Sequence, residues 1–147
     1  MRIERSIEIT APPEEVWCSL VTPEKILKWW ITLERFEYTS DQRDGVGTPF
    51  YIEEKVTGPL MRLNLRVTEW LRNKRLAFSM TSGDFVKAYE QVWTIEGTPS
   101  GSRFTLAEEV ELPYGIAGKL LEPFARRQSE DLIERMLGNL KRLVEAS

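Results

Sequence analysis

The hydrophobic period of the chain changes once, near Pro113, and this change restricts the fold more than any other feature. From residue 33 to residue 112, apolar and polar residues alternate, which is typical of half-buried β-strands. After Pro113, apolar residues return every three or four positions, as they do on one face of an α-helix. This order predicts a sheet of consecutive strands followed by one long helix.

The alternating region divides into six predicted strands joined by short links. Asp44-Gly45 and Asn73-Lys74 supply turn-forming residues for two of these links. The predicted strands cover residues 33–39, 48–57, 60–70, 75–82, 87–97 and 102–112. Successive strands with short links favour an antiparallel meander.

A first strand and two short helices precede the meander. Residues 2–10 alternate and predict a strand. A helix over residues 13–21 follows, because a proline suits its first turn. Thr22 as the N-cap and Pro23 at the first helical position then predict a second short helix.

The C-terminal helix is predicted to begin at Pro123 and to cover residues 123–146, because proline disfavours helical geometry at the residue before it. Residues 115–122 are predicted to form a short lead-in turn or helix. The long helix carries an apolar stripe of Leu132, Met136, Leu140 and Leu143. Such a stripe needs a large apolar surface to cover it, so we expect an α+β arrangement in which the helix packs on one antiparallel sheet.

Histidine is absent from all 147 residues, and Cys18 is the only cysteine. Catalytic systems that use histidine, and zinc sites built from histidine or several cysteines, are therefore excluded. No acidic loop has the spacing of a Ca²⁺-binding loop, so we expect neither a metal nor a cofactor. One cysteine permits no internal disulfide, which fits a cytoplasmic protein.

The charge pattern gives no electrostatic reason for binding nucleic acid or an anionic membrane. The net charge is −3, and acidic and basic residues are mixed along the chain. The first ten residues lack the apolar core of a signal peptide, and no apolar run approaches the about 18 residues of a spanning helix. We expect a single domain over residues 1–147 without stable membrane anchoring. The oligomeric state stays open, a homodimer included.

Four segments carry a resemblance to a known superfamily. They are ITAPPEEVW after the first strand, GVGTPF at the start of the third, GSRFTLAEEVEL as the last strand, and NLKRLVE at the end of the helix. Together they resemble the START-related helix-grip superfamily (SRPBCC), in particular its polyketide cyclase/dehydrase-like and lipid-transport-like bacterial members. The resemblance implies a curved seven-stranded antiparallel sheet around the long C-terminal helix, two short helices between strands 1 and 2, and a hydrophobic cavity between sheet and helix.

Alternation places large side chains on the inward strand faces, where they would line an apolar pocket or fill a closed core. A tryptophan of the second short helix and the first half of the long helix add to this set. The predicted ligand-binding residues are Trp30, Phe50, Ile52, Leu63, Leu65, Phe78, Met80, Tyr89, Gln91, Trp93, Phe104, Leu106, Glu108, Phe124 and Gln128.

Glu54, Gln91 and Glu108 are inward positions that do not suit a dry core, because a buried carboxylate needs partners or a proton. Glu54 lies in a run of charged residues, where a strand bulge would turn it outward. Glu108 has apolar neighbours on its own face and no basic partner that the sequence can place. We therefore expect the pKa of Glu108 to lie above the ~4.3 of a model glutamate.

Three functions fit these features. The first is binding or carriage of a hydrophobic small molecule, such as a lipid, quinone, isoprenoid or polyketide-like compound, and the lack of a recognisable catalytic motif favours it. The second is a cofactor-free cyclase or dehydratase in which Glu108 and Tyr89 supply an acid and a base. The third is a protein-interaction module or regulatory subunit that uses an apolar patch around residues 113–116.

Overall fold

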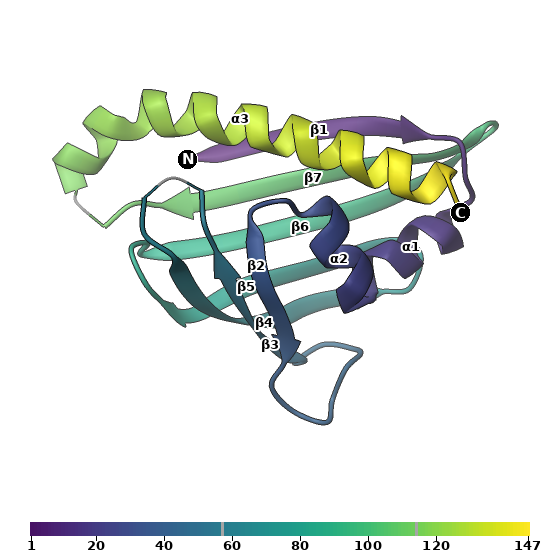
Figure 1. Cartoon of the computed structure of the whole chain (residues 1–147), viewed down its shortest axis with the longest axis horizontal. Coiled ribbons are helices and arrows are strands. Elements are labelled where there is room, and N and C mark those ends of the chain that lie inside the picture. The colour runs from purple at the N-terminus through teal and green to yellow at the C-terminus, as the bar shows by residue number, and fades with distance from the viewer. Residues whose placement is uncertain (57, 114) are drawn as a thin grey trace.

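Seven strands form one antiparallel sheet in the described part of this computed structural model, which comprises residues 1–56, 58–113 and 115–147, with only the backbone of residue 116 (Figure 1). The order across the sheet is β1-β7-β6-β5-β4-β3-β2, so β2 to β7 pair as a meander and β1 joins its far edge beside β7. The strands are β1 Arg2–Ile9, β2 Leu33–Tyr38, β3 Pro49–Glu54, β4 Met61–Leu71, β5 Arg75–Gly83, β6 Ala88–Thr98 and β7 Gly101–Glu111. The predicted meander is confirmed.

Alternation in the sequence becomes alternation in burial along the strands. In β4, Leu63, Leu65 and Val67 are buried while the residues between them are exposed. The register of β3 and β4 places Glu54 opposite Met61, so the chain must leave the sheet between them. The predicted strand over residues 48–57 is therefore too long, and residue 57 lies outside the described part of the chain.

Two short helices, α1 (Pro13–Val21) and α2 (Pro23–Trp29), lie between β1 and β2, as predicted. Thr22 occupies the N-cap position of α2, but its side chain makes no capping hydrogen bond. Its hydroxyl Oγ1 instead donates to the carbonyl oxygen of Cys18 at 2.7 Å. This bond satisfies a carbonyl at the end of α1, where no later helical amide is available.

Helix α3 is one continuous helix from Gly115 to Glu145, and the prediction that it begins at Pro123 is wrong. Proline at position 123 removes one amide donor, which would have bonded to the carbonyl of Lys119. Lys119 and Pro123 are both exposed, so water can satisfy the freed carbonyl. The proline therefore costs a hydrogen bond without ending the helix.

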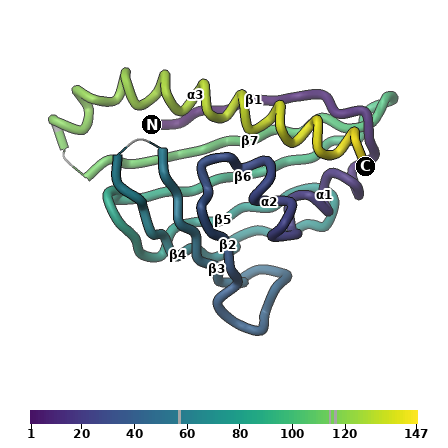
Figure 2. The backbone as a smooth tube through the Cα atoms, viewed as in Figure 1, coloured from purple at the N-terminus to yellow at the C-terminus, as the bar shows by residue number. Residues whose placement is uncertain are grey.

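The C-terminal half of α3 closes the core on the concave face of the sheet. Ile133, Met136 and Leu140 are buried there, and α3 contacts α1, α2 and β1. Figure 2 shows α3 running along β1, and Arg5 of β1 pairs with Glu130 of the helix at 3.3 Å. These contacts confirm the predicted α+β helix-grip arrangement.

Candidate functional site

A cavity of about 280 Å³ lies between α3 and the end of the sheet at which β3 and β7 finish. Most of its wall is apolar, and its polar groups come from α3, the α2–β2 link, and the strands β3, β6 and β7. The lining residues are Met1, Thr32, Glu54, Val56, Met61, Phe85, Val86, Tyr89, Glu108, Val110, Leu112, Ala125, Gln128, Ser129, Leu132, Ile133 and Met136. An apolar hollow with a few convergent polar groups is typical of a small-molecule site.

Glu54, at the end of β3, is the first carboxyl group of the cavity. It is only 5% exposed, and its Oε2 accepts a hydrogen bond from Trp30 Nε1 at 3.0 Å and one from Thr32 Oγ1 at 2.5 Å. Burial raises the pKa of Glu54, although the two hydrogen bonds oppose that rise. The shift in strand register falls between Leu33 and Arg35 of β2, so no bulge turns Glu54 outward.

Glu108, on β7, is the second carboxyl group. Its Oε2 accepts hydrogen bonds from Gln91 Nε2 at 3.0 Å and from Tyr89 OH at 3.3 Å. Burial, reinforced by the negative charge of Glu54, raises the pKa of Glu108 to about 7, which is the direction expected from the sequence.

Gln91, on β6, holds the Glu108 carboxyl in place. It is fully buried, its Oε1 accepts a hydrogen bond from Trp93 Nε1 at 2.8 Å, and its Nε2 also lies 2.6 Å from Tyr89 OH. Burial raises the pKa of Tyr89 well above its usual range, so its phenol stays protonated and acts as a donor. Tyr89 and Gln91, at alternate positions of β6 and so on the same face of the sheet, thus hold Glu108 in place.

The cavity has acidic groups and no basic side chain to balance them. Among the described residues, no Lys or Arg lines it. No group of three or more acidic or Cys side chains in the described ranges could hold a metal ion. The arrangement offers two carboxyl groups, one of them with a pKa near neutrality, facing an apolar space.

The structure divides the predicted ligand-binding residues into separate places. Tyr89, Glu108 and Gln128 line the cavity, whereas Trp30 and Gln91 stand behind its carboxyl groups. Those that are fully buried in the core and do not line the cavity are Ile52, Leu63, Leu65, Phe104 and Leu106. Two others do not border it: Met80 is half-buried, and Phe124 on α3 is 78% exposed.

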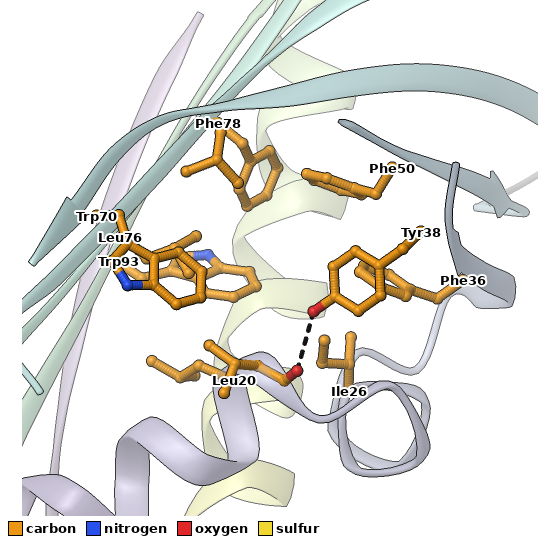
Figure 3. A pocket seen from close by; sticks show the side chains of 11 residues that line it. Leu20, Ile26, Phe36, Tyr38, Phe50, Trp70, Leu76, Phe78 and Trp93 are labelled. Atoms are coloured by element: carbon orange, nitrogen blue, oxygen red, sulfur yellow. Dashed lines mark hydrogen bonds between the residues drawn. The ribbon is translucent and has the colours of Figure 1, made fainter. Parts of the chain in front are cut away.

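Phe50, Phe78 and Trp93 meet around a second, much smaller pocket beside α1 and α2 (Figure 3). Its volume is about 20 Å³, which is room for about one water molecule. Tyr38 closes one side, where its hydroxyl donates to the carbonyl oxygen of Val21 at 2.9 Å (Figure 3). This pocket is an irregularity in the aromatic core rather than a second ligand site.

Sequence reasoning missed most of the cavity wall because these residues lie at strand ends, in links and on α3. Thr32, Val56 and Val86 lie outside the strands, and Ser129 and Leu132 come from the helix. The acidic residues Glu54 and Glu108, in otherwise alternating strands, were the sequence signals that marked this end of the sheet.

Comparison with known proteins agrees with this geometry. A family model described as polyketide cyclase / dehydrase and lipid transport matches residues 1–145. No curated protein matches the chain. No helix in the described residues is long and apolar enough to cross a membrane.

Solved structures of this shape cover almost the whole chain. The protein TTHA0849 from Thermus thermophilus is 28% identical, with a TM-score of 0.81 over 99% of this chain and 97% of that one. A START superfamily protein from Mycobacterium smegmatis (17% identity, TM-score 0.77, 97% and 98% covered) and the Zhui aromatase/cyclase from Streptomyces sp. R1128 (16%, 0.75, 98% and 95%) share the fold. With a family match over nearly its full length and a helix-grip fold around an apolar cavity, the chain belongs to the polyketide cyclase/dehydrase and lipid transport family.

Proposed function

We propose that the protein binds a small hydrophobic molecule in the cavity between α3 and the sheet and acts as its carrier or binding protein. The observation that carries this proposal is the cavity of about 280 Å³, whose wall is mainly aliphatic, aromatic or methionine side chains. Met61 and Met136 suit such a role, because unbranched thioether side chains adapt to irregular ligand shapes. The family description supports lipids and polyketide-like compounds as ligands, and quinones and isoprenoids are further hydrophobic candidates.

The position of α3 supports the same proposal. Its C-terminal half is packed into the core, while Ala125, Gln128 and Ser129 in its first half face the cavity. These residues are smaller or more polar than the buried stripe that follows, so the helix closes the far end of the grip and leaves space at this end. The exposed Cys18 fits a reducing, cytoplasmic setting for such a protein.

A cofactor-free cyclase or dehydratase is a second candidate, because Glu108 and Tyr89 form an acid–base pair. Glu108 has a pKa of about 7, near the value that best serves a general acid or base at neutral pH. Tyr89 OH lies 3.3 Å from Glu108 Oε2. Turnover of a polyketide-like substrate that Glu108→Gln still binds but no longer converts would establish this role.

The interaction-module alternative depended on a patch around residues 113–116. Tyr114 and the side chain of Ile116 lie outside the described residues, and Pro113 is exposed. Leu120, Leu121 and Phe124 of α3 are large apolar side chains exposed close to this segment, and nothing in the described residues shows what would cover them.

A cavity-filling variant tests the proposed function. Leu132 borders the cavity, so Leu132→Trp should occupy the space that a ligand needs. Asp131→Trp is the matched control, because Asp131 is the preceding residue of α3 and is exposed. Binding of neutral alcohols (naphthylmethanol, decanol and cyclohexylmethanol) is measured by titration calorimetry.

We expect the wild type and Asp131→Trp to bind at least one of these alcohols, and Leu132→Trp to bind none. Native mass spectrometry of the freshly purified protein adds a second readout, since a bound ligand appears as extra mass that organic extraction removes. The proposal is wrong if the wild type binds no hydrophobic probe of any charge, or if Leu132→Trp binds as the wild type does.

A further inference from the structure

We propose that the ligand carries a protonated amine or another cationic nitrogen, held between Glu54 and Glu108. The inference rests on the proposed function, because it names the chemical class of ligand for the same cavity. It is based on two carboxyl groups in the cavity wall, each with an oxygen that can still accept a hydrogen bond, and on the absence of any Lys or Arg from the described residues that line the cavity.

In the described part of the chain, no donor bonds to the second oxygen, Oε1, of either carboxyl group. All hydrogen bonds that the structure records to Glu54 and Glu108 end on Oε2. Among the described residues, the one fully buried side-chain polar atom without a partner is Thr98 Oγ1. Oε1 of each glutamate therefore keeps accessible surface, and both residues line the same cavity. Two acceptors remain for a ligand.

Cationic groups at the N-terminus and on β1 and α3 in the described structure contact partners other than Glu54 and Glu108. The amino group of Met1, at the cavity rim, donates to the carbonyl oxygen of Val110 at 2.9 Å. Arg126 of α3 lies 3.8 Å from Glu130, and Arg5 of β1 also contacts that glutamate. Neither arginine lines the cavity. Among the described residues, neither the buried Glu54 nor the half-buried Glu108 has the salt-bridge partner that usually accompanies a carboxylate removed from water.

The charge of a ligand headgroup should determine how tightly the ligand binds in this cavity. A carboxylate or phosphate headgroup would add an anion to a cavity in which two carboxyl groups already resist ionisation, which is unfavourable. A neutral hydroxyl can donate one hydrogen bond but leaves the negative charge uncompensated. An ammonium group carries the opposite charge and has three donors, so it can bond to more than one carboxyl oxygen at a time.

The protein holds both carboxyl groups ready for such a group. Trp30 and Thr32 fix Glu54, while Gln91 and Tyr89 fix Glu108, so a ligand need not order them on binding. The apolar wall around them would cover the hydrocarbon part of an amine. A preorganised site loses less conformational freedom on binding, which favours tight association.

Three probes that share one hydrocarbon skeleton test the inference: naphthylmethylamine, naphthylmethanol and naphthoic acid. Each is titrated into the full chain by calorimetry at pH 8. We expect the amine to bind about tenfold or more tightly than the alcohol, and the acid to bind most weakly.

Variants of the two glutamates provide the second arm. Glu54→Gln and Glu108→Gln should each weaken binding of the amine about tenfold or more while changing binding of the alcohol less than about threefold. Glu109→Gln is the matched control, because Glu109 is the next residue of β7 and is exposed. It should bind all three probes as the wild type does.

The outcomes separate this inference from the proposed function. Equal binding of amine and alcohol, or preferred binding of the acid, overturns the inference and leaves a hydrophobic binding protein. Amine binding that both glutamate variants retain also overturns it, since the carboxyl groups then play no part. Failure of the wild type to bind any of the three probes overturns the inference together with the proposed function.

Discussion

Gln91 of β6 lies directly opposite Glu108 of β7 in the sheet register, and its side-chain amide donates to the Glu108 carboxyl at 3.0 Å. Neighbouring antiparallel strands bring such pairs together on one face. The carboxyl is therefore positioned by the sheet itself rather than by a loop. A group held in this way keeps its geometry whether or not a ligand is present.

Stability should fall as pH rises through the range in which Glu108 ionises. The pKa of Glu108 is raised from 4.5 to about 7 in the folded protein, so the folded state holds this proton more tightly than the unfolded chain does. The contribution is complete below about pH 4.5 and is lost as pH rises through about 7, for a total of about 3 kcal/mol. Glu54, whose pKa is also raised, acts in the same direction.

Glu108→Gln should remove this loss and make the protein more stable than the wild type at pH 8, by up to about 3 kcal/mol. At pH 5 the difference between the two should be small. Urea unfolding at both pH values measures it, with Glu109→Gln as an exposed control on the same strand. Identical pH dependence of the wild type and Glu108→Gln would show that Glu108 is not buried in the folded state.

Trp30→Phe should raise the pKa of Glu54 further. The change keeps an aromatic ring but removes the indole donor that reaches Glu54 Oε2 at 3.0 Å. Loss of this bond to a buried carboxyl should destabilise the protein by about 1–3 kcal/mol. Carbon-detected NMR of the glutamate carboxyl groups follows the titration.

Trp29→Phe is the matched control for this experiment. Trp29 is equally buried, and its indole donates at 2.8 Å to the carbonyl oxygen of Ser19 rather than to a carboxyl group. It should be destabilised to a similar extent while Glu54 titrates as in the wild type. A shift of the Glu54 titration in both variants would refute a specific Trp30–Glu54 bond.

Gln91→Met should raise the pKa of Glu108 and lower stability. Methionine has a similar length but cannot donate to Glu108 or accept from Trp93, whose indole nitrogen lies 2.8 Å from Gln91 Oε1. Leaving a buried donor without a partner costs about 1–3 kcal/mol. Thermal unfolding and carboxyl NMR give the two readouts.

Gln128→Met serves as the comparison, because Gln128 lines the cavity from α3 and no recorded hydrogen bond joins its side chain to a described residue. It should leave the Glu108 titration unchanged. An unchanged Glu108 titration in Gln91→Met would contradict the network.

Phe124→Ala should leave both folding and ligand binding nearly unchanged, although its sequence position suggested a place in the site. The side chain is 78% exposed, and exposed substitutions change stability by about 0.5 kcal/mol or less. Met136→Ala, on the same helix but 3% exposed, should cost about 2–5 kcal/mol. Denaturant unfolding compares them, and a large loss in Phe124→Ala would mean that Phe124 packs against the protein.

The strand pattern could be predicted from the sequence because one face of the sheet is buried throughout. Leu63, Leu65 and Val67 alternate with polar residues, and a slip by one position would expose all of them. The end of α3 was equally clear from its apolar stripe. Its start was not, because proline disfavours helical geometry at the preceding residue without forbidding it, and the carbonyl freed beside Pro123 is exposed to water.

The cavity was harder to predict because alternation tells which face a side chain takes and not what lies above it. Leu65 and Tyr89 both point inward, yet one is packed in the core and the other borders the cavity. The difference depends on where α3 crosses the sheet, which is a contact between distant parts of the chain. Buried carboxyl groups were the informative exception, since Glu54 and Glu108 both mark the wall.

The pairing of β1 with β7 has a consequence for how the chain folds. Ile3 lies opposite Glu108, so the first strand finds its partner only after nearly the whole chain is present. Contacts between such distant segments form slowly, because the entropy cost of closing a long loop comes before the stabilising contacts are made. During synthesis β1 therefore waits as an unpaired strand, and its outward charges, Arg2, Glu4 and Glu8, are the kind that discourage pairing with a second chain. Pairing of β1 with β7 also completes the cavity wall, to which Met1 and Glu108 both belong. Ligand binding can therefore begin only after the first strand has paired with the last.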